Sequence, residues 1–180
     1  MGRKKKRLLI LGAGGHGNVV KEIAESRGYE TSFLDDRNPN AIGSIRDLEQ
    51  ICHSFDECFI AIGNADIRSD LMNRLEQLHR MIPVLIHPTA YISPSAAIGT
   101  GTVVAPHATI HTNAIIGKGS IVSINAVIDH DVKIGDFCHI NSGAICMAGT
   151  HLEDRSKLDA GEILKNETDN GEGKLCMKNM

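Results

Sequence analysis

From residue 86 onward, an aliphatic side chain returns at every sixth position of the chain. Thirteen of the fourteen positions from Ile86 to Leu164 are Ile, Val or Leu, and the exception is Cys146. Four places after each of these positions stands a residue that is mostly Ala, Ser, Thr or Val. A six-residue period fits neither the 3.6-residue turn of a helix nor the alternation of a strand. It predicts a prism in which each hexapeptide forms one side, with the aliphatic residue pointing to the axis and the small residue at the turn.

Such a hexapeptide repeat is typical of a left-handed parallel β-helix, an exception to the usual right-handed crossover. Three sides complete a coil, so the fourteen repeats predict between four and five coils over residues 86–164. The repeat weakens at its end, where Glu162 takes a small-residue position and Glu153–Arg155 are all charged. Residues 165–180 are polar and aperiodic, and we expect them to form a polar tail.

Residues 1–85 have a different pattern, in which short apolar runs alternate with helical periodicity. The runs predict strands, and helices are expected at about 18–26, at 44–51 and around Ile67–Leu78. The predicted strands are Leu8–Leu11, Thr31–Leu34, Cys58–Ile62 and Pro83–Ile86. Strands that alternate with helices indicate a parallel sheet with right-handed crossovers. We therefore predict an α/β N-terminal Rossmann-like half domain, about half the size of a full dinucleotide-binding fold.

Charge and composition indicate which classes of binding partner and which cell compartment to expect. The formal net charge is −3, so we expect neither a nucleic-acid nor a membrane partner. The basic run Arg3–Arg7 fits a solvated terminus better than a phosphate-binding arm. No apolar run is long enough to span a bilayer. The five cysteines are an odd number without CxxC spacing, which favours reduced thiols and a cytoplasmic location.

A glycine-rich turn follows the first predicted strand. Gly12, Gly14 and Gly17 have the spacing of a phosphate-binding turn that opens a helix, and the acidic pair Asp35-Asp36 ends the next strand. Another interpretation is that the glycines form a tight turn and bind no ligand. If they do bind a ligand, the domain is too small for both halves of NAD. A nucleotide-sugar fits better, because it also presents a pyrophosphate, a ribose and a base.

The repeats carry one concentrated set of titratable groups, Asp129-His130-Asp131. His130 takes the third position of its hexapeptide, where a side chain points outward. A carboxylate beside an imidazole fixes its tautomer and stabilises its charged form, which suits a general base. The other interpretation is a solvated surface histidine.

Zinc held between subunits is an alternative, because five histidines lie well inside the repeats: His107, His111, His130, His139 and His151. Stacked coils bring residues eighteen apart together, and none of the five shares such a column with another. We therefore expect no metal.

Together these segments resemble the sugar O-/N-acyltransferases of the sialic acid and bacillosamine type. The resemblance runs from about Arg7 to Gly149. The segments that carry it are Gly12–Gly17, Phe33–Asp36, Ala61–Arg68, Ile86–Pro88 and Asp129–Gly143. It implies transfer of an acetyl group from acetyl-CoA to the amino group of a nucleotide-linked sugar, a UDP-4-amino-4,6-dideoxy-hexose, in a ternary complex. It also implies a homotrimer with CoA between adjacent β-helices.

The resemblance assigns roles to individual residues. His130 is the base, Asp131 the acid that raises its basicity, and His139 lies beside the thioester of acetyl-CoA. The residues implied to bind the nucleotide-sugar are Gly14, Gly15, His16, Asp35, Asp36, Gly63 and Asp66. This sequence has Asp131 where that type of protein carries Glu.

Family members continue with further regular coils where this chain has Glu153–Arg155 and its tail. CoA contacts beyond His139 are therefore not assigned. Three alternatives stay open: O-acetylation of a sialic-acid-like sugar, a GDP-linked acceptor, and a non-catalytic nucleotide-sugar-binding scaffold.

Overall fold

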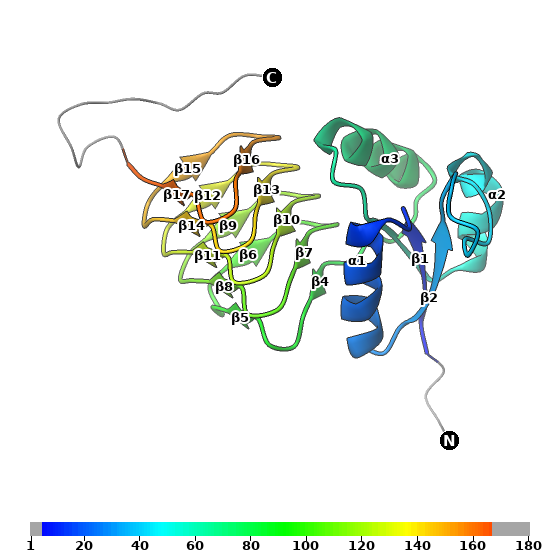
Figure 1. The fold of residues 1–180 in the computed structure, drawn as a ribbon, viewed down its shortest axis with the longest axis horizontal. Coiled ribbons are helices and arrows are strands. Elements are labelled where there is room, and N and C mark those ends of the chain that lie inside the picture. The colour runs from blue at the N-terminus through cyan, green and yellow to red at the C-terminus, as the bar shows by residue number, and fades with distance from the viewer. Residues whose placement is uncertain (1–4, 167–180) are drawn as a thin grey trace.

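The structure, a computed structural model, describes residues 5–166 and has two parts that lie side by side (Figure 1). An α/β part is formed by the elements between Arg7 and Gln77, and a parallel β-helix follows it. This confirms the predicted fold class. Within the described residues, no helix is both long and apolar enough to cross a membrane.

The α/β part is a three-stranded parallel sheet in the order β2-β1-β3 with helices on both faces. Its elements are β1 (Arg7–Leu11), α1 (Gly15–Ser26), β2 (Glu30–Leu34), η1 (Ile45–Asp47), α2 (Leu48–Ile51), η2 (Cys52–Ser54), β3 (Glu57–Ile60) and α3 (Ala65–Gln77). Strand β1 is buried on both faces, which explains its continuous apolar sequence. Leu8 and Ile10 face α1, whereas Leu9 and Leu11 face α2 and α3.

Fourteen two-residue strands make up the β-helix, one for each predicted hexapeptide. They are β4 (Leu85–Ile86), β5 (Tyr91–Ile92), β6 (Ala97–Ile98), β7 (Val103–Val104), β8 (Thr109–Ile110), β9 (Ile115–Ile116), β10 (Ile121–Val122), β11 (Val127–Ile128), β12 (Lys133–Ile134), β13 (His139–Ile140), β14 (Ile145–Cys146), β15 (His151–Leu152), β16 (Lys157–Leu158) and β17 (Ile163–Leu164). They form three parallel sheets, named here after their first strands: the β4 sheet, the β5 sheet and the β6 sheet.

The core of the β-helix has the composition that the period predicts. The second residue of each strand points inward, and the small residue four places later fills the corner, as Ile128 and Val132 do. One difference concerns the predicted strand Pro83–Ile86. Only Leu85–Ile86 is extended, and it pairs with β7 of the β-helix instead of joining the α/β sheet.

The two parts meet through α1, α3 and one face of the prism. Val20 and Ile23 of α1 pack against outward side chains of the β4 sheet, including Val103 and Ile121. On the other side of the α/β sheet, Met72 of α3 belongs to the same apolar cluster as Phe137. The β4 sheet is therefore the side of the prism that the α/β part covers (Figure 1).

The charged segment Glu153–Arg155 does not interrupt the solenoid. Arg155 adopts a left-handed conformation with φ 59°, as residues at other corners do, and its N–H donates to the Asp136 carbonyl oxygen at 2.7 Å. Its side chain reaches the α/β part, where Nε lies 3.5 Å from Asp66 Oδ1. The segment is thus a regular turn, and its arginine contacts the neighbouring part. Of the predicted tail, residues 167–180 lie outside the described residues.

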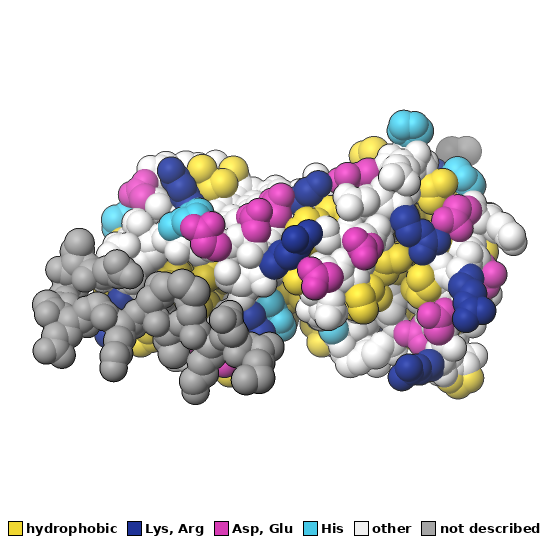
Figure 2. Space-filling view, turned by 90° about the horizontal axis from the view of Figure 1, so that it is seen from above, with side chains coloured by type: hydrophobic (Ala, Val, Ile, Leu, Met, Phe, Trp, Pro, Cys, Tyr) yellow, Lys and Arg dark blue, Asp and Glu magenta, His cyan; other side chains and the backbone are white. Residues whose placement is uncertain are grey.

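Four of the five cysteines, Cys52, Cys58, Cys138 and Cys146, are free thiols in buried positions, and Cys176 lies outside the described residues. The face seen in Figure 2 carries acidic and basic side chains next to each other over both parts, without a field of one sign. This distribution gives a polyanion no continuous surface to bind on that face.

Candidate active site

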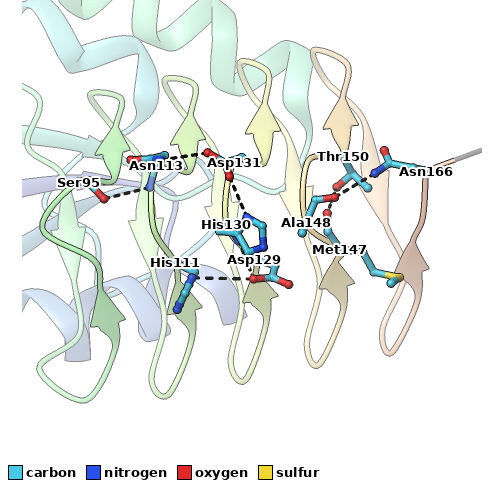
Figure 3. A network of polar contacts seen from close by, with 10 residues as sticks. All are labelled: Ser95, His111, Asn113, Asp129, His130, Asp131, Met147, Ala148, Thr150 and Asn166. Atoms are coloured by element: carbon cyan, nitrogen blue, oxygen red, sulfur yellow. Dashed lines mark hydrogen bonds and ion pairs between the residues drawn. The ribbon is translucent and has the colours of Figure 1, made fainter.

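His130 lies at the corner of the prism where the chain passes from β11 to β12. Its side chain is half exposed, and its Nδ1 lies 2.8 Å from Asp131 Oδ2 (Figure 3). On its other side, Asp129 Oδ1 accepts the backbone N–H of His130 at 2.7 Å. The hydrogen bond to Asp131, together with the charge of Asp129, raises the pKa of His130 above its ordinary value. The structure thus brings together the imidazole and the carboxylate that the sequence predicts, with the other ring nitrogen left to accept a proton.

The glycines of the loop between β1 and α1 differ in whether packing requires them. A Cβ on Gly17 would lie 2.2 Å from the Gly12 carbonyl oxygen, and Gly12 has φ +103° with Ala61 close behind it. These two are therefore required by packing. In contrast, a Cβ on Gly14 or Gly15 would meet nothing within 4 Å. Gly14 is the N-cap of α1 and supplies no side-chain cap, and a helix N-terminus of this kind stabilises a phosphate through its first amide groups.

Asp35 and Asp36, the acidic pair after β2, both accept hydrogen bonds from nearby residues of the chain. Asp35 accepts the N–H of Ala13 through Oδ2 at 2.8 Å, and the N–H groups of Arg37 and Asn38 through Oδ1. These bonds lower the pKa of Asp35 and fix the loop next to the glycine turn. Asp36 is exposed and uses Oδ1 to accept from Ser44 Oγ at 2.6 Å. The same oxygen accepts the N–H of Ile45 at 3.0 Å. Both carboxylates therefore help to hold the loop, and Oδ2 of the exposed Asp36 makes no hydrogen bond to residues 5–166.

Gly63 and Asp66 flank the start of α3, at the carboxyl end of β3 and therefore at the same edge of the sheet as the glycine turn. Asn64 caps this helix by accepting the N–H of Ile67 at 3.0 Å. Both Gly63 and Asp66 are exposed, and Asp66 forms the ion pair with Arg155. The structure thus brings the predicted nucleotide-sugar residues to one edge of the α/β part.

His16 and His139 occupy the junction between the two parts. Nε2 of His16 is buried and has no hydrogen-bond partner among the described residues. Burial, the charge of His139 and that of Arg68 lower the pKa of His16 to about 4. His139 lies on the outward face of the β4 sheet, with Nε2 3.1 Å from Ser123 Oγ. Its pKa is also lowered, by burial first and then by Lys157 and Arg68. At neutral pH both imidazoles are therefore uncharged.

One chain does not bring His139 and His130 together. His130 lies at the corner between the β5 and β6 sheets, which is the corner opposite the β4 sheet. The predicted nucleotide-sugar residues and His139 lie on the β4 side. The predicted site residues are thus divided into two groups on opposite sides of the prism.

Arg68 is a residue for which the sequence predicts no individual role. It is 1% exposed, and its guanidinium donates to the carbonyl oxygens of Gly63, Gly119 and Phe137, at 3.0, 2.6 and 2.6 Å. A fourth bond goes to Ile62. The guanidinium therefore ties the loop after β3 to two stacked turns at one corner of the β-helix. The only signal in the sequence is its position within the segment Ala61–Arg68.

Within residues 5–166, no three His, Cys, Asp or Glu side chains are grouped closely enough to hold a metal ion.

Comparison with known proteins places these features in a family. Residues 7–75 match the PglD N-terminal domain. The chain is 35% identical over 115 residues to the UDP-N-acetylbacillosamine N-acetyltransferase of Bacillus subtilis (strain 168). This alignment covers 55% of the chain and 51% of that relative, so the chain spans about half the length of the curated relative it matches.

Solved structures extend the likeness over both parts. The acetyltransferase domain of PglB from Neisseria gonorrhoeae FA1090 is 36% identical, with a TM-score of 0.85 over 88% of this chain and 82% of that chain. The same domain has been solved in complex with acetyl coenzyme A. PerB from Caulobacter crescentus, solved with CoA and GDP-perosamine, shares the fold at 22% identity and a TM-score of 0.73, over 88% of each chain. The chain therefore belongs to the family of sugar acetyltransferases in which a PglD-type N-terminal domain precedes a parallel β-helix.

Proposed function

We propose that this protein transfers an acetyl group from acetyl-CoA to the amino group of a nucleotide-linked amino sugar, a UDP-4-amino-4,6-dideoxy-hexose. The observation that carries the proposal is the His130–Asp131 pair at an exposed corner of the β-helix, 2.8 Å apart. Membership of the family supports the reaction class. The pair supplies the one group that amide formation requires of a protein, a base for the attacking nitrogen.

The nucleotide-sugar is proposed to bind the α/β part. The first amide groups of α1, next to Gly14 and Gly15, suit its pyrophosphate. Oδ2 of Asp36 suits the ribose or the base, and Gly63 with Asp66 complete the pocket. His16, uncharged and with a buried unpaired nitrogen, can hydrogen-bond the sugar end of the ligand.

The chemistry at His130 follows from its hydrogen bonds. Asp131 accepts a hydrogen bond from Nδ1–H, so the neutral imidazole carries its lone pair on Nε2. Acetyl-CoA supplies an activated acyl group as a thioester. Nε2 takes the proton of the amine as the C–N bond forms, and can return it to the sulfur as the C–S bond breaks. Asp131 stabilises the imidazolium between these two steps. No covalent acyl-enzyme is needed.

His139 is proposed to lie near the thioester. It is half-buried on the β4 side, whereas His130 is at the opposite corner, so one chain cannot place both next to one thioester. The proposal therefore requires that His130 of one copy meets the β4 side of another.

Acetyl-CoA turnover tests the proposed function. We expect thiol release from acetyl-CoA only when a nucleotide-linked amino sugar is present, and fastest with a UDP-linked 4-amino sugar among UDP-, GDP- and CMP-sugars. Mass spectrometry of the product should show one added acetyl group that hydroxylamine does not remove, because an amide resists it. A hydroxylamine-labile product would indicate O-acetylation. Binding without any turnover would indicate a scaffold protein.

A homotrimer is the proposed assembly. The outward column of the β5 sheet is largely apolar, and Tyr91 and Ile163 at its ends are 54% and 47% exposed. The column comprises Tyr91, Thr109, Val127, Ile145 and Ile163. Packing this face between copies would bury it and would place the His130 corner against a neighbour.

Light scattering should therefore give three times the chain mass of 19.4 kDa. We expect Ile145→Glu to yield smaller species with little turnover, since it places a charge in the apolar column. Met81→Glu, at an exposed residue of the α/β part, should remain trimeric. A monomeric wild type that still acetylates its substrate would contradict the shared site.

A further inference from the structure

The corner that carries His130 is stacked on a corresponding turn of the preceding coil. Asn113 lies there, eighteen residues before Asp131, and both adopt the left-handed conformation with φ 58° and 59°. The Asp131 N–H donates to the Thr112 carbonyl oxygen at 2.9 Å, which fixes the two turns against each other. Asn113 is itself held by its backbone N–H, which donates to Ser95 Oγ at 3.0 Å. Figure 3 shows these three turns in line.

The side chain of Asn113 contacts the proposed catalytic pair directly. Its Nδ2 donates to Asp131 Oδ1 at 3.1 Å, while the other oxygen of the same carboxylate faces His130 Nδ1. The two oxygens of Asp131 are thus divided between a fixed amide and the imidazole. The Asp131 side chain is more than half exposed. Among residues 5–166, its carboxylate makes hydrogen bonds only to Asn113 and His130, so these two bonds restrict its rotation.

Other titratable groups lie close enough to His130 to influence its titration. Asp129 lies beside it on the same turn. His111 of the preceding coil has its ring centroid 6.3 Å from that of His130, and its Nδ1 lies 3.9 Å from Asp129 Oδ1. Asn113 adds no charge to this set. Its effect on His130 can therefore come only through the position of Asp131.

We propose that Asn113 is a positioning residue for the His130–Asp131 pair, and that its amide holds the carboxylate in the orientation that accepts the hydrogen bond from His130 Nδ1. This inference rests on the proposed function for its effect on the rate. It adds a residue that contacts neither the substrate nor the reacting atoms. The hydrogen bond from Asn113 also contributes to the low pKa of Asp131, after the larger contribution of His130.

Asn113→Gly tests the proposal without backbone strain, because glycine tolerates positive φ. We expect kcat to fall about three- to tenfold, the range of one ordinary hydrogen bond, because the bond is exposed to solvent and acts only through Asp131, with the KM for the nucleotide-sugar unchanged. The pKa of His130 should fall towards the ordinary histidine value, since the carboxylate would accept its hydrogen bond only part of the time. Asn113→Asp should shift the pKa of His130 in the opposite direction, because it adds a negative charge near the imidazole.

Asn125→Gly is the matched control. Asn125 occupies the same position of its own turn, with φ 56°, and its side chain makes no recorded hydrogen bond among the described residues. Its replacement should leave kcat and the titration of His130 unchanged. A purely structural role of Asn113 would instead change the melting temperature of both glycine variants alike and leave the titration in place.

The titration of His130 can be followed directly by NMR through its ring Cε1–Hε1 signal, assigned with the His130→Ala variant. This readout does not depend on turnover. An unchanged titration in Asn113→Gly would overturn the inference even if the wild type is an active acetyltransferase. Conversely, a wild type without acetyl transfer would contradict the proposed function, while shifted titrations would still support the positioning role.

Discussion

The His130→Ala variant is expected to turn over about 10²–10⁴-fold more slowly than the wild type, which is the usual contribution of a general base. The imidazole accepts a proton only as the C–N bond forms, so its loss should reduce kcat and leave nucleotide-sugar affinity nearly unchanged. Steady-state kinetics together with calorimetric binding of the nucleotide-sugar would measure both quantities. The residue is half exposed, so the variant should fold normally.

His151→Ala is a suitable control for this variant. His151 is also exposed on the β-helix and also faces a carboxylate, with its Nε2 3.2 Å from Glu153 Oε1. Its replacement should leave turnover unchanged. Near-wild-type kcat in His130→Ala would exclude His130 as the base, and His139 would then be the next candidate.

The pH dependence gives a second measure of the same role. The base must be neutral, so the rate should fall as the pH drops through the pKa of His130. Because the hydrogen bond to Asp131 raises that pKa, the acidic limb should lie above the ordinary value of 6.5. In Asp131→Asn the limb should move to lower pH with a smaller loss of rate than in His130→Ala. In His130→Ala it should disappear.

The β-helix could be predicted from sequence because its period is local. Every hexapeptide repeats the same choice, an aliphatic residue such as Ile128 inside and a small one at the corner, so one error would not hide the pattern. The start of α1 could not be placed as well. The prediction began at residue 18, whereas the helix begins at Gly15, since the absence of a side chain at Gly17 allows the helix to pack against the Gly12 carbonyl group.

The candidate site was predictable in its chemistry but not in its arrangement. His130 and Asp131 are adjacent in sequence, so their contact follows from local geometry. That His130 lies opposite the nucleotide loop depends on which side of the prism the α/β part covers. The outward residues Val103 and Ile121 are apolar, but the outward column of the uncovered β5 sheet is also largely apolar, so this pattern alone does not identify the covered side. The role of Arg68 could not be predicted either, because a single arginine on α3 reads as a surface residue.

Arg68→Met is expected to have the largest effect on stability. The guanidinium is buried and has no carboxylate partner among residues 5–166, and its stabilisation comes from carbonyl oxygens of both parts, among them Gly63, Gly119 and Phe137. Burial lowers its pKa to about 10, so the group stays charged at neutral pH. Methionine fills a similar volume but leaves these oxygens without a donor. We expect a loss of about 2–4 kcal/mol in the free energy of unfolding, because each buried unsatisfied group costs about 1–3 kcal/mol and the chain relaxes in part.

Thermal unfolding of Arg68→Met and Arg74→Met would separate this effect from the loss of an arginine as such. Arg74 lies on the same helix, and its Nη2 forms a surface ion pair with Glu49 Oε1 at 2.7 Å. Its replacement should therefore change the melting temperature little. For Arg68→Met we expect a decrease of about 5–15 °C. Arg68→Lys should recover only part of it, since one ammonium group cannot reach carbonyl oxygens on both sides of the junction as the planar guanidinium does. Equal melting temperatures for the two methionine variants would show that Arg68 does not hold the two parts together. In that case the position of His16 against His139 would depend on the other contacts between the two parts, mainly the apolar contacts of α1 with the β4 sheet and of Met72 with Phe137.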